Sequence, residues 1–346
     1  MDQYWLCIDI GYTYSRYVVW DGNDFVDSER ELTHRPKVTT GYDGDRCQQI
    51  WVSQLTDKLH EWKRKWPLIS RVGLSFPGVV DRNGAIARMN SIWGTSGCDL
   101  PKQALAGALA MPVTVLNDLS AAAVRYGNST RFGEATSVMV VSVSSGIGAK
   151  IYDREAGRLV LERSGRNGEI GLVKVDESPH APVTGDGQLV GILGHYASGS
   201  SFARLLRTVA QDEAERSRYE ESALASILAE LGQNLFSADR LLVNESAVKA
   251  MLLGDAFCID VLSRSVKHLA NVLHIGILFN APDAIVLVGG FARSIGALYI
   301  DTLHAHLAPL LTLIYTSEEV RQMIHLGEND DLDNLWGLVI QMERSE

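Results

Sequence analysis

The chain has 346 residues, of which 46% are hydrophobic and 21% are charged, as in a folded globular protein with a large core. Its length favours two domains. The net charge of −10 argues against general binding to nucleic acid or to anionic membranes, and no apolar run approaches the ~20 residues that span a bilayer.

The four cysteines lie far apart and none forms a Cys-x-x-Cys pair, so the sequence indicates neither a disulfide framework nor a zinc knuckle. The chain opens directly into an apolar strand without a signal pattern. We therefore expect a cytoplasmic protein in a reducing environment.

Residues 1–130 read as an N-terminal α/β lobe. Apolar runs broken by a glycine step predict a first hairpin, and helical spacing that ends at Pro67 predicts a long helix after it. The predicted elements are strands at 4–10, 16–20 and 22–30, a helix at 45–67, a strand at 69–81 broken at Pro77-Gly78, a helix at 100–110, a strand at 112–118 and a helix at 120–127.

Residues 131–346 read as a second α/β lobe that also opens with a hairpin. The predicted elements are a hairpin at 135–153, a glycine-punctuated segment at 164–175, helices at 196–230, 236–242 and 255–279, a strand at 284–292 and a last helix at about 334–346. This last helix is a candidate for packing back on the first lobe. Two such lobes predict a pseudo-duplicated architecture with a ligand cleft between them.

Four glycine turns each follow an apolar strand, and glycine allows backbone N–H groups to approach a phosphate. One such turn means little, but four of them together with an Asn-Asp at a strand end favour a phosphate-binding protein. The turns are Asp9-Ile10-Gly11, Ser144-Ser145-Gly146-Ile147-Gly148, Gly168-Glu169-Ile170-Gly171 and Val288-Gly289-Gly290.

In order along the chain, these motifs resemble those of the ROK family (repressors, open reading frames and kinases). The segments "IDIGYTYSRYVVW", "VSVSSGIGAKI" and "FNAPDAIVLVGGFA" resemble its phosphate-binding and nucleotide-side turns. The segment "NSIWGTSGCDL" resembles its sugar segment, and "VTVLNDLSAAAVRYG" resembles its catalytic motif. The segments "GLSFPGVVDRNGAI" and "GRNGEIGLVKV" resemble its G-I-x-x-P-G-x-V-D strand and its G-x-x-G-E-I-G-H motif.

The resemblance implies a sugar kinase/actin-like ATPase (ribonuclease-H-like) fold and an ATP-dependent kinase acting on a hexose or amino sugar. Asp118 would be the catalytic base and would contact the sugar together with Asn90, Asn117 and Glu169. Asp9 would hold the Mg²⁺ of ATP. The phosphate contacts would come from Gly11, Thr13, Ser145, Gly146, Gly148, Gly289 and Gly290. A homodimer is expected from the same resemblance.

Several positions depart from the family pattern. Tyr12, Lys150 and Phe291 stand where phosphate-turn glycines are expected, and Leu172 replaces a zinc-binding histidine. A gap-free alignment puts the three zinc cysteines at Gly185, Gly187 and Ile192, and a sugar-binding glutamate at Gly194. With its ligands missing together, we expect no zinc site.

These departures leave two functions open: a carbohydrate kinase with an altered sugar site, or a non-catalytic sugar-sensing regulator related to the ROK repressors. A direct DNA-binding repressor is disfavoured, because the first strand begins by Trp5 and leaves no room for a helix-turn-helix. Three further features have plainer interpretations: Trp93 as a packing residue, Lys150 as a solvated strand-end lysine, and residues 327–333 as a solvated acidic loop.

Overall fold

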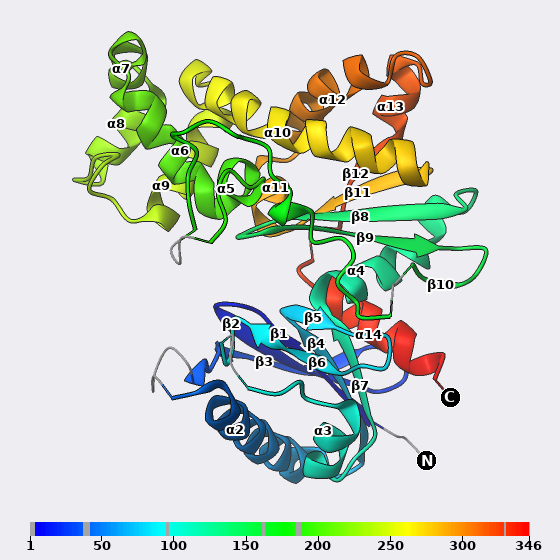
Figure 1. The fold of residues 1–346 in the computed structure, drawn as a ribbon. Coiled ribbons are helices and arrows are strands. Elements are labelled where there is room, and N and C mark those ends of the chain that lie inside the picture. The colour runs from blue at the N-terminus through cyan, green and yellow to red at the C-terminus, as the bar shows by residue number, and fades with distance from the viewer. Residues whose placement is uncertain are drawn as a thin grey trace. The chain divides into compact units, whose positions relative to one another are not determined.

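The structure is a computed structural model that describes residues 4–36, 42–94, 97–160, 163–184, 188–328 and 330–345 (Figure 1). The chain divides into two compact units, each of which is discontinuous in sequence. The first unit is Met1–Gly133 with Lys150–Asn167 and Asp330–Glu346, and the second is Glu134–Ala149 with Gly168–Asn329.

The first unit contains a five-stranded sheet of order β3-β2-β1-β4-β7. Strands β1, β4 and β7 run parallel, whereas β2 pairs antiparallel with both β1 and β3. The bounds are β1 Tyr4–Ile10, β2 Tyr14–Trp20, β3 Phe25–Leu32, β4 Ile69–Phe76 and β7 Val113–Asn117. A separate two-stranded sheet pairs β5 (Gly78–Val80) with β6 (Ile86–Asn90).

Helices cover both faces of the first sheet (Figure 1). Alternate residues of a strand point to opposite faces. Accordingly, Leu6 and Ile8 of β1 pack in the core formed with α2 (Gly44–Lys65) and α3 (Lys102–Leu109). Trp5 and Cys7 pack in a second core with α4 (Asp118–Gly127) and the C-terminal helix α14 (Asp333–Glu343).

The second sheet has the order β10-β9-β8-β11-β12, and the boundary between the units falls within β9. Strands β8, β11 and β12 pair in parallel. The bounds are β8 Ser137–Val143, β9 Ile147–Asp153, β10 Arg158–Leu159, β11 Ala284–Val288 and β12 Ile324–Leu326.

Nine helices follow in the described part of the second unit, and none of the described helices combines the length and hydropathy needed to span a bilayer. They are α5 Gly194–Ala197, α6 Gly199–Gln211, α7 Glu213–Glu220, α8 Ala223–Glu230, α9 Arg240–Leu252, α10 Ala256–Asn280, α11 Gly290–Ile295, α12 Ala297–Leu311 and α13 Ser317–Met323. The described residues also form two 3₁₀ turns: η1 Thr130–Phe132 in the first unit and η2 Ile170–Leu172 in the second.

The sequence-based prediction was wrong in several places. The single helix predicted at 196–230 is four helices: α5 ends at Ala197, and Asp212 and Ser222 cap the N-termini of α7 and α8 through their side chains. The helix predicted at 236–242 begins at Arg240, where Asp239 accepts hydrogen bonds from the N–H groups of Leu241 and Leu242. The prediction also missed β6, β10, α12, α13 and β12, and it extended the strand at 284–292 over residues that form the start of α11.

Candidate active site

The first unit places polar side chains at the carboxyl ends of its three parallel strands. Asp9 of β1 is in register with Ser75 of β4, and Phe76 of β4 is in register with Asn117 of β7. Parallel strands present their carboxyl ends at the same edge, which is where open α/β sheets bind ligands. Asp9, Asn117 and Asp118 therefore share one edge of this sheet.

Asp118 is the first residue of α4 and is half-buried. Its Oδ1 accepts hydrogen bonds from Asn117 Nδ2 at 2.7 Å and from the Leu119 N–H at 2.8 Å. A carboxylate at a helix N-terminus is also favoured by the helix dipole. The side chain is thus held in one orientation by its two neighbours in sequence.

Asn117 is buried and caps α4, with its Oδ1 accepting from the Ser120 N–H at 3.0 Å. Its Nδ2 donates both to Asp118 and, at 3.0 Å, to the Gly78 carbonyl. Both amide hydrogens are therefore engaged within the protein. This geometry makes Asn117 a positioning residue for Asp118, and direct contact between Asn117 and a sugar stays a prediction.

Asp9 is the second carboxylate at this edge. Its Oδ1 accepts hydrogen bonds from Ser75 Oγ and from Asn334 Nδ2, both at 2.8 Å. Burial raises the pKa of Asp9, while the two hydrogen bonds and the positive charge of Arg16 oppose that shift. The sequence analysis missed both Ser75, which lies within a buried apolar strand, and Asn334, which is 325 residues away from Asp9.

The turn after β1 is closed by its own backbone. The Gly11 N–H donates to the Tyr14 carbonyl at 2.9 Å, and a Cβ at Gly11 would lie 2.7 Å from that oxygen. Glycine is therefore required for the shape of the turn, and its N–H is already paired. Thr13 is exposed.

Tyr12 lies in the same turn with 51% of its surface exposed, and the Arg35 guanidinium lies 4.2 Å from its ring centroid. The bulky side chain that replaces the expected glycine therefore lies half exposed at the surface of the first unit.

Asn90 organises a turn at the end of β6. Its Oδ1 accepts from the N–H groups of Ile92 and Trp93 at 2.9 and 3.1 Å, and its Nδ2 donates to the Ala87 carbonyl at 2.9 Å. Trp93 is fully buried against Phe76, which confirms that it is a packing residue. Contact between Asn90 and a sugar stays a prediction.

The second unit brings two of the predicted phosphate turns together. Strands β8 and β11 are parallel, so the turn from Ser144 to Gly146 and the Gly289-Gly290 step follow adjacent strand ends. Gly289 has a φ of 96°, and a Cβ there would lie 2.7 Å from the Val143 carbonyl oxygen. By contrast, a Cβ at Gly146 or Gly290 would meet open space.

Phe291 does not fill this open space. Its side chain is 8% exposed and packs against Phe202 and Tyr299, with ring centroids 5.1 and 6.4 Å away. The residue that replaces the third glycine therefore belongs to the hydrophobic core of the second unit.

Lys150 is not the solvated lysine that the sequence suggested. It is 3% exposed, and its Nζ donates to the carbonyls of Gly165 (3.2 Å) and Asn167. The lysine thus ties β9 to the loop at 163–167 within the first unit. Carbonyl acceptors compensate the burial of its charge.

Glu169 is exposed and precedes η2, in which Leu172 is 54% exposed. Gly171 has no room for a side chain, because a Cβ there would lie 2.6 Å from the Ile147 carbonyl oxygen. The Ala149 N–H donates to the Gly168 carbonyl at 2.8 Å, so this glycine turn lies beside the start of β9 and its Gly148.

The structure describes only part of the segment 185–194, for which the sequence predicts no zinc site. Gly185 and Gly187 lie outside the described residues, whereas Ile192 is buried and Gly194 begins α5. Across the ranges that the structure describes, no three His, Cys, Asp or Glu side chains gather as a metal site. The absence of zinc stays a prediction.

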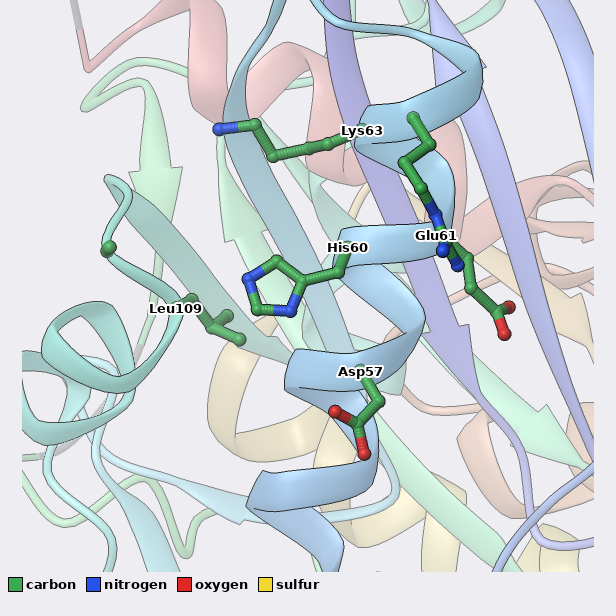
Figure 2. Close-up of a pocket in the computed structure, with 7 residues that line it drawn as sticks. Asp57, His60, Glu61, Lys63 and Leu109 are labelled. Atoms are coloured by element: carbon green, nitrogen blue, oxygen red, sulfur yellow. The ribbon is translucent and has the colours of Figure 1, made fainter.

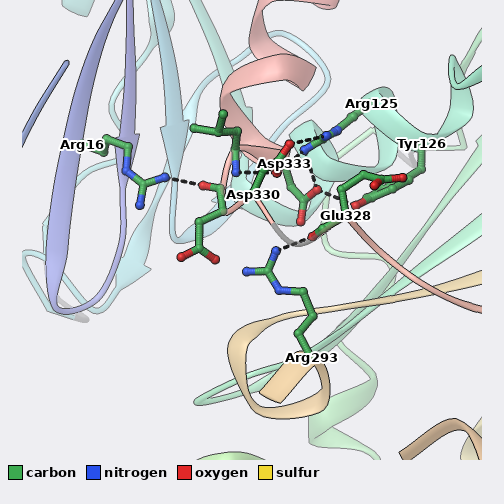
Figure 3. Close-up of polar contacts among 9 residues, drawn as sticks. Arg16, Arg125, Tyr126, Arg293, Glu328, Asp330 and Asp333 are labelled. Carbon is green, nitrogen blue, oxygen red and sulfur yellow. Dashed lines mark hydrogen bonds and ion pairs between the residues drawn. The ribbon is translucent and has the colours of Figure 1, made fainter. Parts of the chain in front are cut away.

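The acidic segment 327–333 is not simply solvated (Figure 3). Arg125 forms ion pairs with Asp330 at 2.6 Å and with Asp333 at 2.9 Å, and Tyr126 donates to Asp333 at 2.6 Å. In the second unit, Arg293 donates to the Glu328 carbonyl at 2.8 Å. The sequence analysis missed this because the arginines are distant in sequence.

A surface pocket of about 560 Å³ opens beside the C-terminal half of α2 (Figure 2). His60 and Lys63 extend from α2 toward Leu109, while Asp57 and Glu61 give the pocket mixed charge. Because α2 leads into β4 and Leu109 precedes β7, the pocket lies at the amino ends of the parallel strands. It is therefore at the opposite edge of the sheet from Asp9 and Asp118.

Comparisons of the sequence and of the fold with known proteins match the ROK family and kinases. A family model described as "ROK family" matches residues 5–331. The C(7)-cyclitol 7-kinase of Streptomyces hygroscopicus subsp. limoneus is 31% identical over 271 residues, which cover 77% of this chain and 72% of the relative.

Two solved structures are similar in fold. A ROK family glucokinase from Streptomyces griseus, in complex with glucose and AMPPNP, matches with a TM-score of 0.72 and 20% identity over 99% of this chain and 100% of that chain. A ROK family transcriptional regulator, a homolog of the E. coli MLC protein, matches with a TM-score of 0.74 and 18% identity over 99% and 78%. These matches confirm the predicted sugar kinase/actin-like α/β fold.

Proposed function

Because the chain belongs to the ROK family, we propose that it is an ATP-dependent kinase that phosphorylates a hydroxyl group of a sugar or a cyclitol. The observation that carries this proposal is the Asp118 carboxylate, held by Asn117 and the Leu119 N–H at the carboxyl edge of the first sheet. The relative that acts on a C(7)-cyclitol supports extending the substrate class from hexoses to cyclitols.

In this proposal Asp118 accepts the proton of the substrate hydroxyl as that oxygen attacks the γ-phosphate. General-base catalysis by a positioned carboxylate typically contributes about 10²–10⁴-fold to the rate. The hydrogen bonds from Asn117 and from the backbone fix the carboxylate before substrate binds. In phosphoryl transfer such positioning and charge neutralisation supply most of the catalysis.

The residues present suit a nucleotide with magnesium. The open space at Gly146 and Gly290 is the kind of glycine-lined surface that a phosphate can approach. Asp9 supplies a carboxylate oxygen, the ligand type that Mg²⁺ prefers. When bound, Mg²⁺ would neutralise phosphate charge; Asp9 would hold it, and Ser145, Gly146, Gly148, Gly289 and Gly290 would contact the phosphates. Thr13 and Glu169 remain candidates for phosphate and sugar contacts.

The test has two parts. Calorimetry with ATP and Mg²⁺ measures nucleotide binding, and a panel of hexoses, amino sugars and cyclitols is then screened for ADP release. We expect ADP release with at least one polyol, and we expect Asp118→Ala to abolish it. Sugar binding without any nucleotide binding would replace this proposal with the regulatory function, in which the protein senses a sugar and acts through a partner.

A further inference from the structure

The C-terminal helix α14 contributes a side chain to the carboxyl edge of the first sheet. Asn334 Nδ2 donates to Asp9 Oδ1 at 2.8 Å, and Ser75 Oγ donates to the same oxygen at 2.8 Å. Both donors bind the same oxygen, which restricts the orientation of the carboxylate. Neither of these two hydrogen bonds involves Oδ2.

The strand pattern explains why Asp9 faces α14. Trp5 and Cys7 of β1 pack against α14, and Asp9 is the next residue on that face. Their shared core contains Leu335 and Leu338 of α14, both fully buried. Apolar packing against β1 therefore holds in place the helix that carries Asn334.

Polar contacts hold the first turn of α14 as well. Asp333, the residue before Asn334, is 8% exposed and accepts hydrogen bonds from Arg125 at 2.9 Å and from Tyr126 at 2.6 Å (Figure 3). Both donors lie on α4, whose first residue is Asp118. The placement of Asn334 is thus coupled to the helix that presents the proposed base.

We propose that Asn334 is a positioning residue that holds the Asp9 carboxylate in the orientation that serves magnesium. This inference rests on the proposed kinase function. Groups that hydrogen-bond a metal-ligating side chain fix its orientation, and their loss typically lowers metal affinity by about tenfold or more. Burial raises the pKa of Asp9, and the hydrogen bonds from Asn334 and Ser75 oppose that rise.

The first test needs neither metal nor nucleotide. Carboxyl ¹³C NMR of the full chain, with the Asp9 signal assigned from Asp9→Asn, gives the pKa of Asp9. Asn334→Ala should raise this pKa because it removes a donor. Asn334→Asp should raise it further, because it has nearly the same shape but adds a negative charge. In the unmodified protein the Asn334 side-chain amide signal should shift as Asp9 titrates, a readout that requires no variant.

The second test measures the Mg²⁺ concentration for half-maximal turnover. We expect an increase of about tenfold for Asn334→Ala and no change for Gln341→Ala on the same helix, with the sugar KM unaltered. An unchanged Asp9 pKa in folded Asn334 variants, or an amide signal that ignores the titration, would overturn the inference. If the unmodified protein binds no Mg–ATP, the proposed function fails, while the NMR titration still decides whether Asn334 controls Asp9.

Discussion

At the scale of single residues, the roles proposed for Asp118 and Asp9 differ, so the two side chains should respond differently to removal of their charge. Asp118→Asn retains an oxygen that accepts from Asn117 and from the Leu119 N–H, so the fold should persist. We expect kcat to fall by about 10²–10⁴-fold, with little change in the KM for ATP. The matched control is Asp24→Asn in an exposed turn, which should leave both constants unchanged. Full activity in Asp118→Asn would exclude Asp118 as the base.

Asp9 gives a prediction about pH. Burial raises its pKa in the folded protein, so ionising this side chain lowers the free energy of unfolding. Asp9→Asn keeps the Oδ1 acceptor for Ser75 and Asn334 but carries no charge. The variant should therefore be more stable than the unmodified protein at neutral pH.

The stability difference between Asp9→Asn and the unmodified protein should depend on pH. It should shrink as the pH falls through the raised pKa of Asp9, and vanish near the ordinary aspartate value of about 3.9. Urea unfolding of Asp9→Asn and of the unmodified protein over a series of pH values measures this difference in the free energy of unfolding. A difference that grows toward acid pH would show that the pKa of Asp9 is lowered instead.

Tyr12 replaces a glycine of the phosphate-turn pattern. Its position indicates that this replacement has little effect on stability or on nucleotide binding. It is half exposed beneath Arg35 rather than packed in the turn. Tyr12→Ala should change the free energy of unfolding by less than about 0.5 kcal/mol, as is usual for surface sites. The affinity for Mg–ATP, measured by calorimetry, should also be unchanged. A large gain in nucleotide affinity would mean that the ring competes with phosphate.

Several residue-level features could not be read from the sequence. Tyr12 and Phe291 both replace expected glycines, but only the tertiary structure shows that one is exposed and the other lies in a core. The sequence around Lys150 does not indicate that its Nζ donates to the carbonyls of Gly165 and Asn167. A side chain's direction depends on neighbours that are distant in sequence.

At the scale of elements, the packing of α14 on α4 is the contact most sensitive to a single added carbon. A Cβ at Gly337 would lie 1.8 Å from the Ala121 carbonyl oxygen, so Gly337→Ala must push the two helices apart. Overpacking of this kind costs about 1–3 kcal/mol or more, and urea unfolding should show the loss. Gly107→Ala on α3 is the control, because its Cβ would meet open space. It should be neutral or stabilising by up to about 1 kcal/mol. Equal effects of the two substitutions would contradict the packing described.

The elements were predictable where periodicity and breakers agree. The strand over 112–118 and the long helix that ends before Pro67 are examples, and both were found with small changes of boundary. Errors occurred where the chain passes from one helix to the next without a proline. No proline occurs across 196–230, and the largely polar α7 is separated from its neighbours by N-terminal caps at Asp212 and, for α8, Ser222.

At the scale of the whole molecule, only part of the arrangement could be predicted from the sequence. The order of motifs predicted the family and the fold, because each motif combines a strand end with a glycine turn or an acid. The C-terminal segment belongs to the first unit, where Asn334 contacts Asp9. No local sequence pattern predicts that contact. Long-range polar partners of this kind become visible only in the folded chain.

A ligand that binds the folded chain and not the unfolded chain should stabilise the entire protein. At a concentration of 100 times its Kd, such a ligand adds about 2.7 kcal/mol to the free energy of unfolding. We expect Mg–ATP to produce a rise in melting temperature that grows with the logarithm of its concentration. Asp118→Asn should show the same rise, because the proposed function assigns Asp118 to the substrate hydroxyl and not to the nucleotide. Asp9→Asn should reduce it, because that carboxylate is assigned to magnesium. A rise that is equal with ATP and EDTA, or that is lost in Asp118→Asn alone, would contradict this division of roles between the two carboxylates.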